Sequence, residues 1–389
     1  MKPFSIDHYL GKELVLDLTG SPEELTYVGI LDRFNWLTNH NSKLSIPQDN
    51  DIEDEIKHTE KIIKTLYKYN DSSLSDIQKN TKKIAVFDYE NQLKELQYFP
   101  YLDYPLNQIG GIHLNTIEFM NSVHPIRTKS EAKAFIKRTD LIKEVYEGTL
   151  NHLKKQADNG IYPPEFVYGH VINQLDEFIN ISNSEHPLYK QFMLKVKKLE
   201  LGNDEIDYLE KEITRSINES VTPGFKLLRN FMANTQKNAN KNHGIWSQPG
   251  GDEYYKLKIR TFTTTDYSPE EIHQMGLSEV KRISSRMKEI LTSLGYDENK
   301  SVGELMNELN ENPDFLYADT PDRKEIVVND YTDMVNEAVR VMVDYFHTMP
   351  KSEVIVKAVP EYSEQNAAGG YYQSPALDGS RPGVFYANL

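Results

Sequence analysis

The last 21 residues of the chain hold its densest group of side chains that could take part in chemistry. Four glycines, two prolines, four aromatic residues and Arg381 lie between Gly369 and Leu389. Glycine lets a ligand approach the backbone closely, a guanidinium can bind a carboxylate through two hydrogen bonds, and tyrosine hydroxyls can donate. This composition favours a binding segment over the alternative, an ordinary twisted hairpin with a long loop.

Metal-binding patterns are not found elsewhere in the sequence. The chain has 11 histidines and no cysteine, and the closest two histidines, His113 and His124, are 11 residues apart. No H-x-x-x-H pair can therefore lie on one helical turn, and thiolate zinc sites, iron–sulfur clusters and cysteine nucleophiles are excluded. A site assembled from distant histidines stays open, although each lone histidine is expected to be a surface or core residue.

The elements that must position the C-terminal residues are predicted to be mostly helices. The clearest helix is predicted over 128–158, where Thr128 and Glu131 have capping-box spacing. Ser268 precedes a Pro-Glu-Glu run, which is typical of a helix start, and the pattern that follows ends at Gly295. The apolar residues that recur at helical spacing in this second pattern are Ile272, Met275, Val280, Ile283, Met287, Ile290 and Leu294.

The C-terminal part is predicted to contain a small sheet. Residues 353–359 and 384–388 are rich in β-branched and aromatic side chains, so each is expected to form a strand, with a turn at 369–372 between them. The predicted fold is therefore mainly α, with a small β-sheet near the C-terminus. A glycine-rich loop suggests a helical region over 1–240 and a second region over 241–389, although both could form one continuous body.

The composition limits the partners that the chain is expected to have. Lysine and arginine number 44 and aspartate and glutamate 59, so the formal charge is −15. A field of this sign repels phosphate backbones, so no nucleic-acid partner is expected. The first residues lack the apolar run of a signal peptide, and no window has the length of a transmembrane helix. We therefore expect no membrane association and a cytoplasmic location.

The C-terminal residues resemble a bacterial family known as domain of unknown function 885. In that family, paired tyrosines precede a D-G-S-R-P-G-x-F-Y-x-N stretch. The matching positions here are Tyr371, Tyr372, Asp378, Gly379, Ser380, Arg381, Pro382, Gly383, Phe385, Tyr386 and Asn388. Weaker matches at Pro249-Gly250, Thr263-Thr264-Thr265 and Gly160-Ile161-Tyr162 extend the resemblance over nearly the whole chain. The family is similar to zinc metallopeptidases, which have largely helical folds and an H-E-x-x-H helix.

The resemblance implies a substrate-binding role for part of the C-terminal segment. The strand over 384–388 would lie beside a peptide substrate and pair with its backbone. Arg381 would receive a substrate carboxylate, and Tyr371 or Tyr372 would bond to the scissile carbonyl; the alternative is that Arg381 pairs with an internal acid and the tyrosines pack. The candidate substrate-binding residues are Tyr371, Tyr372, Asp378, Ser380, Arg381, Tyr386 and Asn388.

One departure from the family pattern concerns the metal site. In the family, the zinc-binding helix comes downstream of this segment, whereas the sequence ends at Leu389. We therefore expect no catalytic residue, no metal ligand and no cofactor in this chain, zinc in the intact family protein, and a missing C-terminal segment as a partner. An apolar last strand with no following element to cover it also suggests a truncated chain.

These observations lead to one expected function and two alternatives. The chain is expected to be the N-terminal part of a zinc-metallopeptidase-like hydrolase that acts on peptides or small amides, and to be inactive alone. The first alternative is a pseudoenzyme or helical binding protein that keeps the substrate groove without the chemistry. The second is a metal-independent scaffold whose helices bind partner proteins. Whether the chain is an enzyme therefore stays open at the level of the sequence.

Overall fold

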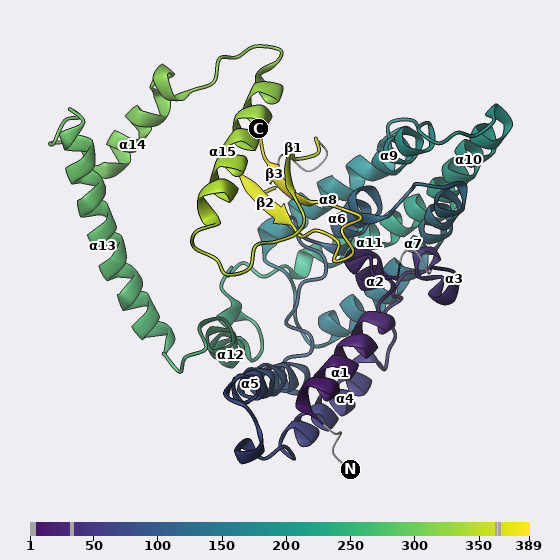
Figure 1. Cartoon of the computed structure of the whole chain (residues 1–389), viewed down its shortest axis with the longest axis horizontal. Helices are drawn as coiled ribbons and strands as arrows, with labels where there is room; N and C mark the ends of the chain where they lie inside the picture. Colours follow the sequence, from purple (N-terminus) through teal and green to yellow (C-terminus); the bar gives the residue numbers. More distant parts are fainter. Residues whose placement is uncertain (1–4, 32–34, 362–363, 365–366) are drawn as a thin grey trace. The chain divides into compact units, whose positions relative to one another are not determined.

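The chain folds mainly into α-helices, with one small sheet near its C-terminus (Figure 1). The computed structural model describes residues 5–31, 35–361, 364 and 367–389. The helices, in chain order, are α1 (Ile6–Gly20), α2 (Pro22–Val28), α3 (Asn35–Thr38), α4 (Asp51–Leu66), α5 (Asp76–Tyr98), α6 (Ile112–Glu118), α7 (Lys129–Asp158), α8 (Glu165–Asn180), α9 (Pro187–Val196), α10 (Asn203–Ser216), α11 (Thr222–Thr235), α12 (Gly251–Thr263), α13 (Pro269–Ser293), α14 (Val302–Glu311) and α15 (Arg323–Met342). In the part of the chain that the structure describes, none of these helices is long and apolar enough to cross a bilayer. The prediction of a mainly α fold is confirmed.

Contacts within the chain divide it into two compact units. The first consists of Met1–Tyr255 and Ser374–Pro382, and the second of Lys256–Gln373 and Gly383–Leu389. The segment 374–382, which carries three of the seven candidate site residues, is therefore grouped with the N-terminal helices. The division predicted between residues 240 and 241 stays a prediction.

Helix α7 forms the centre of the first unit. The Thr128 hydroxyl accepts a hydrogen bond from the Glu131 backbone N–H at 3.2 Å, as the capping-box spacing predicted. The buried face of α7 packs against α10 and α11. A Cβ atom at Gly224 of α11 would lie 2.8 Å from the ring of Tyr146. A glycine at this position therefore allows α11 and α7 to approach each other closely.

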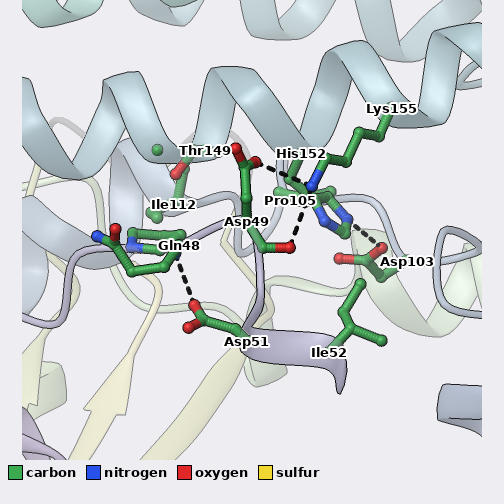
Figure 2. Close-up of a pocket in the computed structure, with 12 residues that line it drawn as sticks. Gln48, Asp49, Asp51, Ile52, Asp103, Pro105, Ile112, Thr149, His152 and Lys155 are labelled. Carbon is green, nitrogen blue, oxygen red and sulfur yellow. Dashed lines mark hydrogen bonds and ion pairs between the residues drawn. The ribbon is translucent and has the colours of Figure 1, made fainter. Parts of the chain in front are cut away.

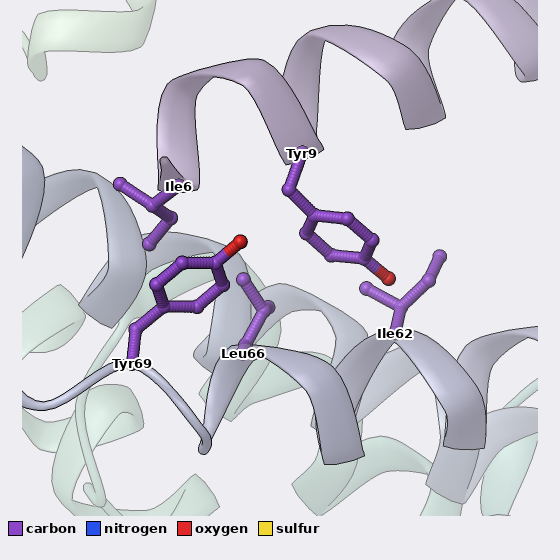
Figure 3. Close-up of a cluster of buried hydrophobic side chains, with 5 residues drawn as sticks. All are labelled: Ile6, Tyr9, Ile62, Leu66 and Tyr69. Atoms are coloured by element: carbon purple, nitrogen blue, oxygen red, sulfur yellow. The ribbon is translucent and has the colours of Figure 1, made fainter. Parts of the chain in front are cut away.

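An apolar cluster joins α1 to α4 at the start of the chain. Ile6 and Tyr9 of α1 point toward Ile62 and Leu66 of α4, and Tyr69 closes one end of the cluster (Figure 3). All five side chains are buried, and burial raises the pKa of Tyr9 to about 12. Their removal from water holds the first helix against the rest of the unit.

A buried arginine on α7 connects the helix to the N-terminal segments. The Arg138 side chain is fully buried, and its guanidinium donates hydrogen bonds to backbone and side-chain oxygens. The acceptors are the carbonyl oxygens of Pro22, His40 and Lys43, at 2.8–3.1 Å, and the Thr26 hydroxyl, at 2.7 Å. Carbonyl groups that are buried away from water need such donors, so the charge and the loops stabilise each other.

The second unit contains a three-stranded sheet made by β1 (Val354–Ala358), β2 (Gly370–Gln373) and β3 (Gly383–Ala387). The strand order is β1–β3–β2, with β1 and β3 parallel and β2 and β3 antiparallel. Helix α15 packs against β1. The two predicted strands are confirmed, whereas residues 370–372, expected in a turn, pair with β3 as part of β2.

The position of β3 corrects a second expectation from the sequence. This last strand was expected to be apolar and uncovered, but it lies in the middle of the sheet with a hydrogen-bonded strand on each side. Four of its five residues are buried. Pairing on both sides satisfies the backbone groups of β3, so the strand needs no further element at its edges.

We predict that replacing Arg138 by methionine destabilises the protein by roughly 3 kcal/mol or more, because several buried oxygens then lose their donor. The free energy of unfolding, measured by urea denaturation and circular dichroism, tests this. The matched control is Lys137→Met, at the neighbouring exposed position of α7. Equal stability of the two variants would show that the Arg138 hydrogen bonds contribute little.

Candidate functional site

The guanidinium of Arg381 is held by backbone carbonyls of the first unit. Nη1 donates to the Ser374 carbonyl at 2.7 Å, and Nη2 donates to the Tyr27 carbonyl at 2.9 Å. The guanidinium also lies over the Tyr27 ring, 5.2 Å from its centroid, which is a favourable position for a cation. Arg381 thus fixes the segment 374–382 against the end of α2.

The exposed end of the same segment carries Asp378 and Ser380. The Ser380 backbone N–H donates to Asp378 Oδ1 at 2.9 Å, and the Leu377 N–H donates to the Val28 carbonyl at 2.8 Å. Gly29 follows α2 with a φ of 73°, and a Cβ atom there would lie 2.8 Å from Asp378 Oδ1. Glycine is therefore required at position 29 both for its conformation and for the close approach of Asp378.

The three candidate tyrosines lie on the sheet of the second unit. Tyr371 of β2 lies opposite Tyr386 of β3, and their rings stack with centroids 4.9 Å apart. Tyr386 is buried in an apolar cluster with Val359 and Val384. Tyr372 points the other way along the strand and is 53% exposed. Of the three, only Tyr372 is an exposed residue.

Asn388 is hydrogen-bonded to residues that lie between β1 and β2. Its side-chain amide donates to the carbonyl oxygens of Glu364, at 2.8 Å, and Ala367, at 3.2 Å. The Asn388 backbone N–H donates to the Gly369 carbonyl at 3.0 Å, and the Glu364 carboxylate pairs with Lys324 at 2.5 Å. Asn388 therefore fixes the segment that enters β2.

The seven candidate residues fall into two groups. Asp378, Ser380 and Arg381 belong to the first unit, and the three tyrosines and Asn388 belong to the second. Their substrate roles stay predictions. The geometry adds two constraints: both edges of β3 are already paired, so a substrate backbone could not pair with this strand, and Arg381 already binds two carbonyl oxygens.

The described residues do not fit a zinc ion. They contain no group of three or more histidine, cysteine, aspartate or glutamate side chains that could hold a metal. The buried histidines have other partners: His113 lies 3.0 Å from Gln174 Oε1, His124 Nδ1 lies 2.9 Å from Arg138, and His186 Nδ1 accepts the Leu188 N–H. No step of metal chemistry is therefore assigned to these residues.

The first unit contains a small cavity that no sequence pattern predicted, between α7 and the segments before α4 and α6 (Figure 2). Its volume is about 250 Å³. The residues that line it are Pro47, Gln48, Asp49, Asp51, Ile52, Asp103, Pro105, Ile112, Gly148, Thr149, His152 and Lys155. A Cβ atom at Gly148 would lie 2.5 Å from the Pro47 carbonyl oxygen, so glycine lets this segment lie directly against α7.

The charged groups of the cavity bind one another. Lys155 Nζ lies 2.9 Å from Asp49 Oδ1, and this hydrogen bond raises the pKa of Lys155. His152 Nε2 lies 2.9 Å from Asp103 Oδ1, and Asp51 accepts the Gln48 N–H at 2.7 Å (Figure 2). Three aspartates against one lysine, with His152 counted as neutral, make the lining acidic, so it favours cations over anions. These pairs fix the cavity wall.

The sequence contained only a weak signal for this cavity. Thr149, His152 and Lys155 are spaced by three residues on α7, which places them along one face of a helix. Their partners Asp49 and Asp103 come from segments that are far away in the sequence, so the pairing needed the tertiary structure.

We predict that buried histidines weaken the fold as the pH falls. Burial lowers the pKa of His113 and of His186 from 6.5 to about 4. The unfolded chain therefore takes up these protons first, so the free energy of unfolding is highest above about pH 6.5 and decreases toward pH 4. In His186→Asn the decrease should be smaller by roughly 3 kcal/mol, because one titrating group is gone. Urea denaturation at pH 7 and pH 4 measures it.

The control for this pH dependence is His273→Asn, which removes an exposed histidine from α13. This variant should keep the pH dependence of the original chain. An unchanged decrease in His186→Asn would show that His186 does not resist protonation in the folded state.

We predict that Arg381→Met loosens the segment 374–382, because the Ser374 and Tyr27 carbonyl oxygens lose a charged donor. The Leu377 amide, which donates to Val28, should exchange with solvent about tenfold faster, corresponding to about 1.4 kcal/mol. Hydrogen exchange with mass spectrometry measures this. Ser380→Ala, which removes only an exposed hydroxyl from the same segment, should leave the exchange unchanged; equal effects in both variants would contradict the role of Arg381.

Comparisons with known proteins place this architecture in a family. No curated protein matches the chain. A solved structure of a "putative lipoprotein" from Colwellia psychrerythraea has a TM-score of 0.85 and 26% identity, and the match covers 96% of this chain and 66% of that chain. A second "putative lipoprotein of unknown function", from Shewanella oneidensis, has a TM-score of 0.52 and 12% identity over 95% of this chain and 64% of that chain, and shows the fold alone.

The chain thus spans slightly less than two thirds of the length of these two solved proteins. The predicted cytoplasmic location stays a prediction. The family model described as "Bacterial protein of unknown function (DUF885)" matches residues 22–389, which is nearly the whole chain. The match agrees with the resemblance found in the C-terminal segment, and we conclude that this chain belongs to the DUF885 family.

Proposed function

We infer that this chain forms the substrate-binding walls of a hydrolase that acts on peptides or small amides. The groups that activate water lie in a part of the protein outside these residues, and the chain alone is inactive. Zinc is the cofactor of the intact protein in this proposal, but no described residue of this chain is assigned to it.

The observation that carries the proposal is the way the family residues are held. The side chains of Arg381 and Asn388 donate hydrogen bonds to backbone carbonyls. These bonds fix the segment 374–382 and the residues that lead into β2. Tyr372, Asp378 and Ser380 are left exposed at positions defined by these bonds. Polar groups that are held in place by their surroundings, and still reach solvent, suit the binding of a peptide-like substrate.

The seven candidate residues have different roles in this proposal. In the second unit, Tyr372 is the residue that contacts the carbonyl of the substrate. In the first unit, Asp378 and Ser380 are the candidates for contacts with polar groups of a substrate. Arg381, Tyr386 and Asn388 position these residues, and Tyr371 supports Tyr386 by stacking. The length of the Colwellia structure supports the remaining part of the proposal, because about a third of that protein has no counterpart in this chain.

The alternative function is a helical binding protein without chemistry. The acidic cavity beside α7 favours this alternative, because it offers a small site in the first unit that needs no metal. Both functions predict an inactive chain, so they are separated by what the longer protein does.

Zinc content and peptide turnover test the proposal. The purified chain, dialysed against zinc and then against metal-free buffer, should hold well below one zinc per chain and should not hydrolyse fluorogenic peptides. If the reading frame continues past codon 389 with an H-E-x-x-H motif, the longer polypeptide should hydrolyse them. Stoichiometric zinc or turnover in the chain alone would contradict the proposal.

A substitution in the longer polypeptide tests the role of Tyr372. Tyr372→Phe removes one hydroxyl and should lower kcat/KM about tenfold, as expected for the loss of one hydrogen bond. Tyr345→Phe, which removes the hydroxyl of another exposed tyrosine, serves as the matched control. An unchanged kcat/KM in Tyr372→Phe would remove Tyr372 from the substrate site.

A further inference from the structure

Helix α13 carries an apolar stripe along its whole length. It starts at a complete capping box, in which Ser268 and Glu271 satisfy each other's backbone N–H groups, and Figure 1 shows it as one uninterrupted helix. Ile272, Ile283 and Ile290 lie on one face, because steps of 7 and 11 residues return to nearly the same direction at about 100° per residue. Such a stripe is typical of a helix that packs against a partner.

The described residues of the second unit do not cover this stripe. Of the residues of α13, all of which lie in the described part of the chain, only Leu291 is buried. The exposed members are Met275, Leu277, Val280, Ile283, Ile290 and, just after the helix, Leu294, with exposed fractions between 44% and 67%. Soluble proteins rarely expose a contiguous apolar surface of this length unless something binds it.

The polar side of α13 behaves as an ordinary solvated surface. Arg282 pairs with Glu279 at 2.7 Å, and Arg286 pairs with Glu289 at 2.9 Å, in both cases within the helix. Lys281 and Ser285 are also exposed. Glu279 and Arg286 lie one turn from Ile283, so the charged pairs border the apolar stripe, whereas Lys281 and Ser285 lie on the opposite side of the helix.

The same unit exposes apolar residues on α15. Met334, Val339, Val341 and Met342 are all exposed, although α15 buries Val327 and packs against β1. By contrast, α7 has a comparable apolar pattern and buries it against other helices of the first unit. Two helices of the second unit therefore leave apolar residues exposed, whereas α7 of the first unit buries its apolar face.

The comparison with the Colwellia structure indicates what the cover is. The match includes 96% of this chain, so a counterpart of nearly every element is present there, but it includes only 66% of that chain. About a third of the relative therefore has no counterpart in this chain. A segment of that size has enough residues to supply the helices that an apolar face of this length requires.

We propose that the apolar face of α13 is the docking surface for the remaining third of the family protein, which presents a helix with aliphatic residues at the same spacing. This inference rests on the proposed function, because it assumes that the catalytic groups lie in that remaining part. The face formed by Met275, Val280, Ile283, Ile290 and Leu294 gives the segment an apolar seat, and the charged pairs of α13 flank it.

The experiment uses this chain and, as the probe, the polypeptide encoded directly after codon 389, added in trans in equimolar amount. Hydrogen exchange of α13 is measured in both samples, and the amides of 275–291 should exchange at least about tenfold more slowly when the probe is present. In Ile283→Glu this protection should be lost. Ser285→Glu is the matched control, because it introduces the same charge about 200° away on the helix and should keep the protection.

Several outcomes would overturn the proposal. The proposal is overturned if the reading frame encodes no further segment, or if the segment binds without protecting α13. It is also overturned if the chain alone forms a dimer that Ile283→Glu dissociates and Ser285→Glu does not, because the face would then belong to an interface with a second copy. Protection of α13 by vesicles of phosphatidylglycerol and phosphatidylcholine would likewise overturn the proposal, because the face would then bind a lipid surface.

The readouts separate this inference from the proposed function. Protection of α13 without peptide hydrolysis would support the docking surface and contradict the hydrolase. Hydrolysis with α13 unprotected would support the hydrolase and overturn the docking surface.

Discussion

The first unit depends on a buried positive charge that is satisfied by backbone oxygens. The Arg138 guanidinium reaches Pro22 and Thr26 of α2 and the carbonyl oxygens of His40 and Lys43. A charge in the interior is costly unless its hydrogen-bonding capacity is used, and buried carbonyls are costly unless they meet donors. Both costs are reduced at Arg138, so these hydrogen bonds hold α2 and residues 40–43 against α7.

A second arginine also donates a hydrogen bond to a backbone carbonyl of α2. Arg138 binds the beginning and middle of α2, and Arg381 binds the Tyr27 carbonyl at its end. Gly29 then lets the chain turn away beside Asp378. A seven-residue helix is too short to be stable by itself, so its position is set by these contacts. The family residues around Arg381 are therefore placed by the same core that Arg138 organises.

Helices α7 and α13 differ in how completely they bury their apolar faces. In the first unit, α7 and α11 pack closely enough to require Gly224, and pairs such as Lys155 with Asp49 fix the wall of the acidic cavity beside α7. In the second unit, the sheet is well paired while α13 exposes an ordered apolar stripe. An amphipathic helix gains most of its stability from packing, which gives α13 a physical reason to bind a partner.

Local patterns in the sequence were sufficient for α7, α13, two of the strands and the family. The capping box at Thr128 and the stripe after Ser268 depend on residues three or four positions apart, so they can be recognised without the fold. The D-G-S-R-P-G stretch likewise identified the family residues. Neither kind of pattern contains information about partners that are distant in the chain.

The strand pairing and the side-chain contacts between distant parts of the chain were decided by the tertiary structure. Residues 370–372 became a strand because β3 was available to pair with them, and β3 became the central strand because β1 lies on its other side. Arg381 is hydrogen-bonded to Tyr27, which is 354 residues away in the sequence, and His152 to Asp103, which is 49 residues away. Hydrogen bonds and charge pairs act over a few ångströms in space whatever their separation in sequence, so only the folded chain shows which side chains are held and which remain exposed to bind.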